Sequence, residues 1–216
     1  MKTLTIFTPA YNRAHTIGRT YESLLRQTSK DFEWLVIDDG STDNTCELVK
    51  GWIKENRITI RYIRQENQGM HGAHNTAYRN ITTELNTCID SDDFMPDDAV
   101  EKITHFWKEY GSDKYAGIVG LDQTEDGSII GTSFPQALKE TTLQDYYAKG
   151  GSGDKKLVYR TDLIKQYPDY PLFEGERYVG LAYKYMLIDQ DYKLLTLNLP
   201  LVTVEYQLDG SSYNMY

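Results

Sequence analysis

The sequence contains only two cysteines, Cys46 and Cys88, among 216 residues. Cys88 lies in an apolar run and Cys46 in a predicted helix, so we expect two buried free thiols and no disulfide framework. No apolar stretch approaches the roughly 20 residues that a membrane-spanning helix requires. The N-terminal residues form a strand pattern that lacks the apolar segment of a signal peptide, so we expect a cytoplasmic location.

Basic residues are outnumbered by acidic ones. The chain has 23 Lys and Arg residues and 32 Asp and Glu residues, which gives a formal net charge of -9. Non-specific nucleic-acid binding depends on basic side chains that contact phosphates, so nucleic acid is not an expected partner. A small phosphorylated ligand held at a local metal site is compatible with this charge. No basic amphipathic helix is visible, and peripheral contact with the inner face of the membrane stays open, as does the oligomeric state.

Apolar runs and apolar residues at helical spacing alternate along the first half of the chain. The predicted strands cover 4–7, 32–37, 58–63 and 85–89. The first and third predicted helices cover about 15–27 and 73–81. The second predicted helix starts at a cap formed by Ser41 or Thr42 and reaches Trp52. Strands that alternate with helices indicate an α/β fold with a mainly parallel central sheet and helices on both faces.

The second half is less regular. Pro96 opens a predicted helix that extends through Trp107, and segments 115–121 and 128–134 have strand patterns around a tight turn. No linker, repeat or low-complexity segment interrupts the chain, so we predict a single domain over residues 1–216. Within it, residues of about 1–95 form a nucleotide-binding half, and those of about 96–216 build the acceptor side.

Polar clusters follow three of the predicted strands. These clusters are Thr8–Arg13, Asp38–Asp43 and Asp90–Asp93. Parallel-sheet proteins bind ligands beyond the carboxyl ends of their strands, so the three clusters are expected to meet at one edge of the sheet.

The acidic run Asp90-Ser91-Asp92-Asp93 supplies three carboxylates at a strand end. Hard divalent cations commonly take one or two carboxylates together with substrate phosphates, so the run predicts a metal site. Strand alternation is expected to point Asp90 and Asp92 the same way. The alternative to a metal site is a loop that caps the helix after Pro96. We expect Asp93 only to cap that helix.

Four motifs in order resemble those of glycosyltransferase family 2. The matching residues are Phe7-Thr8-Pro9-Ala10-Tyr11-Asn12-Arg13, Leu35-Val36-Ile37-Asp38-Asp39-Gly40-Ser41-Thr42-Asp43, Asn67-Gln68-Gly69 and Ile89-Asp90-Ser91-Asp92-Asp93. Their order and separations also fit, and together they cover roughly the first half of the chain. The resemblance implies the GT-A (nucleotide-diphospho-sugar transferase) fold. It also implies an inverting, metal-dependent glycosyl transfer, like that of bacterial capsular and cell-wall polysaccharide enzymes.

The resemblance further implies roles for individual residues. A nucleoside-diphosphate sugar is the implied donor, a glycan or lipid-linked sugar the implied acceptor, and Mn or Mg the implied cofactor. Asp92 is the implied principal metal ligand, with Asp90 near the metal or the ribose, and Asp39 accepts a hydrogen bond from the base. The implied nucleotide-binding residues are Thr8, Pro9, Ala10, Tyr11, Asp39, Asn67, Gly69, His71, Asp90 and Ser91. Asp38 has a competing structural role, because the first Asp of such a turn often caps the following helix.

Two positions depart from the family pattern. Related sequences often carry a basic residue where this chain has Met70, and His71 is our candidate for a replacement polar contact. The alternative for His71 is a surface or helix-capping histidine. Many family members also place Glu-Asp where this chain has Leu181-Ala182.

Inverting transfer needs a general base that removes a proton from the acceptor hydroxyl. Segment 173–181 contains a Gly-Glu-basic-aromatic sequence similar to that of capsule and cell-wall enzymes, so we nominate Glu176 as catalytic base and Glu174 as second candidate. Exposed glutamates are often only solvated charges, which is the alternative for both.

Three other functions remain as alternatives. A sugar nucleotidyltransferase also uses metal and carboxylates, but its first loop is usually rich in glycine, unlike Thr8–Asn12. A dinucleotide-dependent oxidoreductase is disfavoured because no Gly-x-Gly-x-x-Gly follows the first strand. A non-catalytic nucleotide- or glycan-binding module stays open because the Glu-Asp pair is missing.

Overall fold

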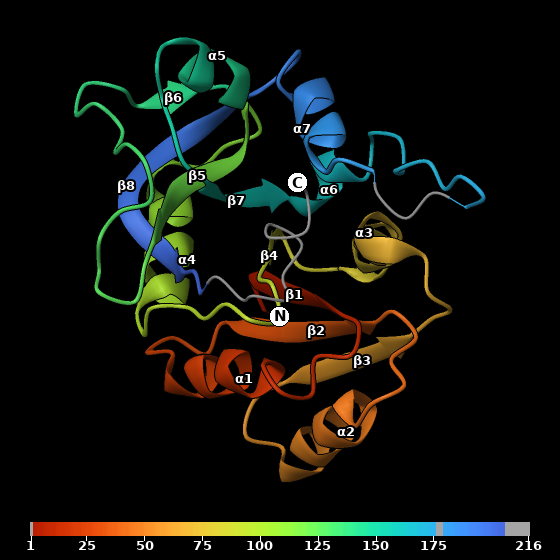
Figure 1. Cartoon of the computed structure of the whole chain (residues 1–216). Coiled ribbons are helices and arrows are strands. Elements are labelled where there is room, and N and C mark those ends of the chain that lie inside the picture. The colour runs from red at the N-terminus through yellow and green to blue at the C-terminus, as the bar shows by residue number, and fades with distance from the viewer. Residues whose placement is uncertain (1, 176–178, 206–216) are drawn as a thin grey trace.

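The structure is a computed structural model, and it describes residues 2–175 and 179–205. These residues form a sheet with the strand order β3-β2-β1-β4-β7-β5-β8-β6 (Figure 1). The strands are β1 (Leu4–Ala10), β2 (Phe32–Asp38), β3 (Ile60–Arg64), β4 (Leu85–Cys88), β5 (Tyr115–Gln123), β6 (Glu140–Thr141), β7 (Lys155–Arg160) and β8 (Lys193–Thr203). The helices are α1 (Ile17–Arg26), α2 (Thr45–Glu55), α3 (Gly69–Asn80), α4 (Ala99–Tyr110), α5 (Leu143–Ala148), α6 (Thr161–Ile164) and α7 (Ala182–Ile188). Within the described ranges, no helix has the length and apolarity needed to cross a membrane.

The first four strands are parallel, as the sequence predicted. Ala10 at the end of β1 lies opposite Asp38 of β2, and Asp38 lies opposite Arg64 at the end of β3. On the other side of β1, Phe7 pairs with Cys88, the last residue of β4. The carboxyl ends of these strands therefore share one edge of the sheet, which brings the three polar clusters together.

The remaining strands make the sheet mixed. β7 runs antiparallel to both β4 and β5, whereas β8 runs parallel to β5. The strand expected at 128–134 is wrong, because Ile129 forms only one isolated bridge, with Gln123. Its neighbours bond to different partners: the Ile130 amide donates to the Asp122 carbonyl at 2.9 Å and the Thr132 amide to the Ser152 carbonyl at 3.1 Å.

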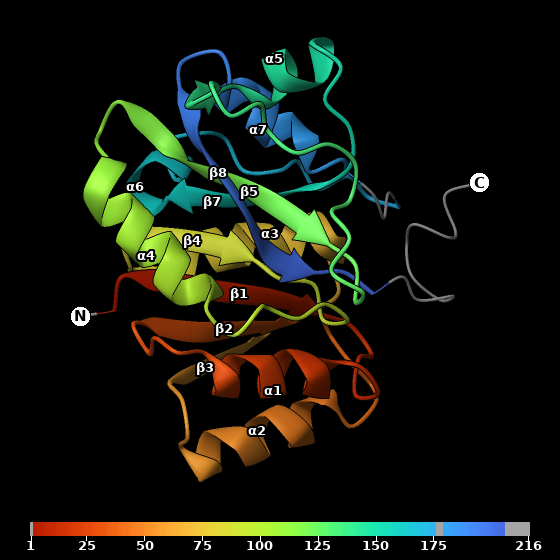
Figure 2. The ribbon, with the colours of Figure 1, turned by 90° about the vertical axis from the view of Figure 1, so that its left-hand side faces the viewer.

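Side chains alternate across the sheet and build a core on each face. Ile6 and Trp34 pack in one core with residues of α1, α2 and α4. Their chain neighbours Phe7 and Leu35 pack in the other core with residues of α3, α6 and α7. Figure 2 shows α1 and α2 beside strands β1 to β3, and α5 and α7 at the opposite end of the molecule. The prediction of helices on both faces is confirmed.

Two local expectations need correction. The helix predicted at 73–81 begins at Gly69, so part of the predicted loop is its first turn. Gly69 has a φ of 75°, a left-handed conformation in which the chain turns into the helix at little steric cost. Both cysteines are free, as expected, but only Cys46 is fully buried, whereas Cys88 is half-buried.

Candidate functional site

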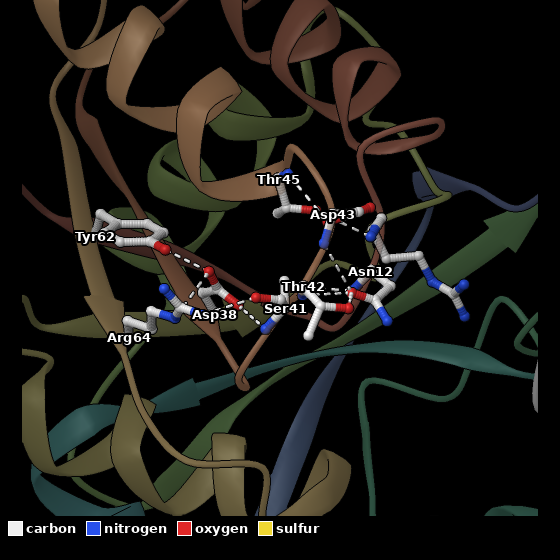
Figure 3. A network of polar contacts seen from close by, with 9 residues as sticks. Asn12, Asp38, Ser41, Thr42, Asp43, Thr45, Tyr62 and Arg64 are labelled. Atoms are coloured by element: carbon white, nitrogen blue, oxygen red, sulfur yellow. Dashed lines mark hydrogen bonds and ion pairs between the residues drawn. The ribbon is translucent and has the colours of Figure 1, made fainter.

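The first two polar loops are tied together by side chain to backbone hydrogen bonds (Figure 3). Asn12 lies in the left-handed region with a φ of 55°. Its side-chain oxygen accepts hydrogen bonds from the amides of Thr42 at 2.7 Å and Asp43 at 3.3 Å. In return, the Asn12 amide donates to the Ser41 hydroxyl at 3.0 Å, and the Ala14 amide donates to the Asp43 carboxylate at 3.0 Å. The loops after β1 and β2 therefore form one unit.

Asp38 has a structural role in this unit. Its side chain is fully buried, and one carboxylate oxygen accepts the Ser41 amide at 2.7 Å. The other oxygen accepts a hydrogen bond from the Tyr62 hydroxyl and lies 4.0 Å from the Arg64 guanidinium. Asp38 therefore closes the turn and ties it to β3, which leaves no oxygen pointing at a ligand.

The predicted helix cap at Ser41 or Thr42 is wrong. The helix α2 begins at Thr45, and its N-cap residue Asn44 makes no side-chain cap hydrogen bond. Asp43 binds the first turn instead, because its carboxylate accepts the Thr45 amide at 3.0 Å. Ser41 lies three residues before the N-cap position Asn44, and its hydroxyl accepts a hydrogen bond from the Asn12 amide.

Asp39 points the other way from Asp38 and lines a cavity. One carboxylate oxygen accepts hydrogen bonds from the Gln65 side chain at 2.7 Å and the Gln68 amide at 2.9 Å. Burial raises the pKa of the Asp39 carboxyl above its usual value, and the Gln68 amide opposes that rise. Gly40 follows with a φ of 83°, and a Cβ at this position would lie 3.1 Å from the Asn67 amide nitrogen. The close approach holds Asp39 against the loop before α3.

The cavity that Asp39 borders has a volume of about 870 Å³. It lies where the ends of β1, β2 and β4 meet the start of α3. Its lining includes eight of the residues predicted to bind the nucleotide, namely Pro9, Ala10, Tyr11, Asp39, Asn67, Gly69, His71 and Ser91. The remaining wall comes from Arg13, Gln68, Met70, Ala73 and the segment 172–175. Residues far apart in the sequence thus converge as predicted.

The other two predicted nucleotide residues lie outside this lining. Thr8 is fully buried, and its hydroxyl accepts a hydrogen bond from the Trp34 indole at 2.9 Å. The Thr8 side chain therefore supports the core under the loop. Asp90 borders a second, separate cavity, so it lies at the other side of the acidic run.

His71 and Met70 lie at the first turn of α3. The His71 side chain is buried, which rules out the surface histidine considered from the sequence, and it lines the cavity. Its ring nitrogen Nδ1 is buried and has no hydrogen-bond partner among the described residues. Buried polar atoms are normally paired, so this nitrogen marks a position where a ligand can bond. Met70 is partly exposed on the same wall.

The acidic run forms a turn, because the Asp93 amide donates to the Asp90 carbonyl at 3.1 Å. The expectation that strand alternation aligns Asp90 and Asp92 is therefore wrong, since β4 ends at Cys88. Asp90 is exposed and Asp92 is half-buried. Both residues lie in the loop that directly follows β4.

Asp93 does not cap α4, whose N-cap residue is Asp98. It is buried, and its carboxylate accepts the Glu205 amide at 3.2 Å. Burial, reinforced by the nearby charge of Asp90, raises the pKa of Asp93 to about 8. The Lys156 ammonium lies among these carboxylates and donates to the Cys88 carbonyl at 2.9 Å, which holds the end of β4 beside the run.

The carboxylates fit a hard divalent ion only in part. No group of three or more His, Cys, Asp or Glu side chains in the described part of the chain is arranged to hold a metal by itself. Asp90 and Asp92 provide oxygen atoms, the ligands that Mg²⁺ and similar ions prefer. An ion bound here would need further oxygen ligands, and the phosphates of a substrate supply such ligands.

The structure describes one of the two candidates for the catalytic base. Glu174 is exposed and lines the 870 Å³ cavity, together with Leu172 and Phe173. Glu176 lies outside the described residues. Leu181 and Ala182, the positions at which the family resemblance led us to expect a Glu-Asp pair, border the second cavity, and their side chains offer no proton acceptor there.

Several site residues were missed from the sequence. Gln68 holds Asp39, and Leu172 and Phe173 close one wall of the cavity although more than 130 positions separate them from Asp39. No local pattern reports such contacts. Asn12 lies within one of the four motifs, and asparagine is enriched at left-handed positions, so its conformation carried a usable signal.

We expect Asn12→Ala to lower the free energy of unfolding by about 2–4 kcal/mol, because it removes the hydrogen bonds to Thr42 and Asp43 and places alanine in a left-handed conformation. Asn12→Gly removes the same bonds without the steric penalty, so its loss should be smaller by about 1 kcal/mol. Urea denaturation of the three proteins measures both values. Equal stability of all three would contradict the role of Asn12 in joining the loops.

Comparison with known proteins identifies the family. The model of the family described as "Glycosyl transferase family 2" matches residues 5–167, which include all four motifs. Glycosyltransferase GlyA of Streptococcus pneumoniae is 36% identical over 114 residues, which cover 53% of this chain and 16% of GlyA. Chondroitin synthase of Escherichia coli is 42% identical over 98 residues, which cover 45% of this chain and 14% of that enzyme. The chain thus matches a small part of the length of these relatives.

Solved structures agree on the fold. TarS 1–349 of S. aureus in complex with UDP-GlcNAc superposes with a TM-score of 0.75 at 22% identity, covering 100% of this chain and 62% of that chain. The mannosyltransferase PcManGT from Pyrobaculum calidifontis in complex with GDP-Man and Mn2+ has a TM-score of 0.62 at 17% identity, covering 91% of this chain and 57% of the other. At these identities the likeness shows the fold, which is GT-A. With the family match over most of its length, the chain belongs to glycosyl transferase family 2.

Proposed function

We propose that this chain transfers a sugar from a nucleoside-diphosphate sugar to a glycan or lipid-linked acceptor in bacterial polysaccharide synthesis, with inversion at the anomeric carbon. The observation that carries the proposal is the 870 Å³ cavity, in which the family's nucleotide motifs converge from the ends of β1, β2 and β4. Relatives and structural neighbours that act on sugars support it, among them the UDP-GlcNAc complex of TarS.

The nucleoside is placed in this cavity. Tyr11 is exposed at its wall and presents an aromatic face to a base, while Pro9 and Ala10 contribute backbone. Asp39 accepts a hydrogen bond from the base with the carboxylate oxygen that Gln65 and Gln68 do not use. His71 offers the unpaired Nδ1 to the ribose or the diphosphate, in the part of the wall where Met70 provides no charge.

The diphosphate is placed at the acidic run. Asp92 would be the principal ligand of Mn or Mg, and Asp90 the second, since both present carboxylate oxygens near the edge of the sheet. When bound, the ion would neutralise the charge that develops on the departing diphosphate. A GDP-Man and Mn2+ complex of the neighbour PcManGT supports a divalent ion in this fold.

The acceptor side is assigned to residues of about 96–216, within a domain that spans 1–216. Glu176 would take the proton from the acceptor hydroxyl as that hydroxyl attacks, and Glu174 is the second candidate for this base. Glu174 supports the assignment of the segment to the active site because it lines the cavity.

A thermal-shift panel of UDP, GDP, ADP, CDP and dTDP, each with manganese, tests the donor site. A ligand at a hundred times its Kd stabilises the folded state by about 2.7 kcal/mol. For a chain of this size that corresponds to a rise in Tm of about 5–10 °C. We expect one of these nucleotides to produce such a rise and a chelator to reduce it. If none of them raises the Tm, the proposed function is wrong.

A non-catalytic nucleotide- or glycan-binding module is the second candidate, because Leu181 and Ala182 carry no carboxylate. Such a module would bind the nucleotide in the same panel but would neither transfer nor hydrolyse the donor sugar. A sugar nucleotidyltransferase would release pyrophosphate, whereas the proposed enzyme releases nucleoside diphosphate, so the released product distinguishes these two.

A further inference from the structure

Helix α1 carries a row of polar side chains on its buried face. Thr20, Ser23 and Gln27 are three and four positions apart, which places them on one side of the helix. Each of them is at most 2% exposed, and they share the buried side of the helix with the core residues Ile17 and Leu24. Buried polar groups destabilise a fold unless they are hydrogen-bonded, so the partners of this α1 polar row show what it holds.

The first two members of the α1 polar row bond to the backbone of the acidic run and its continuation. The Thr20 hydroxyl donates to the Asp93 carbonyl at 2.8 Å and lies 3.5 Å from the Asp90 carbonyl oxygen. The Ser23 hydroxyl accepts a hydrogen bond from the Met95 amide at 3.2 Å. Thr20 therefore contacts the carbonyls at both ends of the acidic turn.

The same loop is held further along the chain. The Gln27 side chain donates to the Pro96 carbonyl at 2.8 Å and accepts the Val100 amide at 3.0 Å, which joins α1 to the start of α4. From the end of β8, the Thr203 amide donates to the Phe94 carbonyl at 2.7 Å, and the Phe94 amide donates to the Thr203 carbonyl at 3.1 Å. Two elements distant in the sequence thus bond to the backbone that carries the acidic run.

The geometry of this turn matters for an ion that Asp90 and Asp92 would bind together. Their carboxylates can meet one ion only when the backbone between them has the right shape. A site whose binding-competent conformation is only fractionally populated binds its ligand more weakly by that fraction. A group that fixes the backbone of the turn therefore strengthens metal binding without being a ligand.

We propose that Thr20 is a positioning residue for the metal site. Its hydroxyl holds the acidic turn in the conformation in which Asp90 and Asp92 can share one divalent ion. Thr20 acts through the backbone of the turn, because its hydroxyl contacts carbonyl oxygens. The inference rests on the proposed function, which assigns the ion to these two carboxylates.

Thr20→Val is the principal test, because valine keeps the branched shape of threonine and removes the hydroxyl. Thr20→Ser keeps the hydroxyl and is the conservative variant. Thr141→Val is the matched control, since the buried Thr141 hydroxyl also donates to a backbone carbonyl, that of Thr142 at 2.9 Å, but in the edge strand β6. Electron paramagnetic resonance of free manganese measures the Kd of the ion. The titrations contain the nucleoside diphosphate of the thermal-shift panel that stabilises the wild type.

Thr20→Val should bind manganese about 3–10-fold more weakly than the wild type, because the turn spends less time in the competent conformation. Thr20→Ser should stay within about twofold of the wild-type Kd. Both valine variants leave a buried carbonyl without its donor, so each should lose about 3–8 °C in Tm. Thr141→Val should nevertheless bind manganese as the wild type does, which separates positioning from a general loss of stability.

The inference is overturned if Thr20→Val binds manganese as tightly as the wild type, or if Thr141→Val or Thr20→Ser weakens binding as much as Thr20→Val does. If valine at position 20 prevents folding, Thr20→Ala replaces it in the comparison, because alanine and serine also differ by one hydroxyl. A wild type that binds no manganese with any nucleoside diphosphate would instead contradict the proposed function.

Discussion

Asp92→Asn is expected to reduce the rate of sugar transfer about a thousandfold, because the metal ion supplies several kcal/mol of charge stabilisation to the departing diphosphate. Asparagine keeps the size of the side chain and removes its charge, so the fold should persist. Release of nucleoside diphosphate at saturating donor measures the rate. A manganese titration should show a weaker apparent affinity in the variant than in the wild type.

Asp97→Asn is a matched control, since Asp97 is also an aspartate close to the acidic run. Its carboxylate forms an exposed ion pair with Arg26 at 3.0 Å, and exposed pairs contribute little. This variant should keep wild-type activity and metal affinity. If Asp92→Asn retains more than a tenth of the wild-type rate, Asp92 is not the principal ligand.

Glu176→Gln is expected to reduce transfer by about a hundredfold to ten-thousandfold, which is the usual contribution of a general base. Glutamine cannot take the acceptor proton but has nearly the same shape as glutamate. The affinity for the donor nucleotide, measured by calorimetry with manganese, should therefore stay at the wild-type value. Full turnover in this variant would exclude Glu176 as the base.

Glu174→Gln, measured in parallel, separates the two candidates. Glu174 lines the nucleotide cavity, so loss of its charge can change donor affinity, whereas loss of a base changes the rate with donor affinity intact. We expect a smaller loss of rate for Glu174→Gln than for Glu176→Gln. The reverse order would transfer the role of base to Glu174.

Local spacing was enough to predict most of the elements in the first half of the chain. Apolar runs such as 32–37 became strands, and the expected alternation of faces appears in the adjacent residues Trp34 and Leu35. The segment 128–134 has a similar pattern but is not a strand, because the neighbouring edge offers only one bridge, at Ile129. A strand pattern indicates that a segment can extend, but the pairing depends on a partner elsewhere in the chain.

Within the site, the adjacent residues Asp38 and Asp39 also show that local sequence does not decide which contacts a residue makes. Both are carboxylates at the end of one strand, and the family resemblance covers both. Asp38 is saturated by the Ser41 amide and the Tyr62 hydroxyl, whereas Asp39 lines the cavity and accepts the Gln65 side chain and the Gln68 amide on one oxygen. Ser41 is close to Asp38 in the sequence, but Tyr62 is 24 positions from Asp38 and Gln68 is 29 positions from Asp39.

The sequence by itself determined the parallel orientation of the first strands, the shared edge at which their polar ends meet, and the acidic run Asp90–Asp93 at that edge. These features come from local periodicity and from the geometry of parallel strands. Only the tertiary structure decided that the run is a turn, that Thr8 supports the core, and that a second cavity borders Asp90. Burial and hydrogen-bond partners come from distant segments, and no local pattern records which segments will meet.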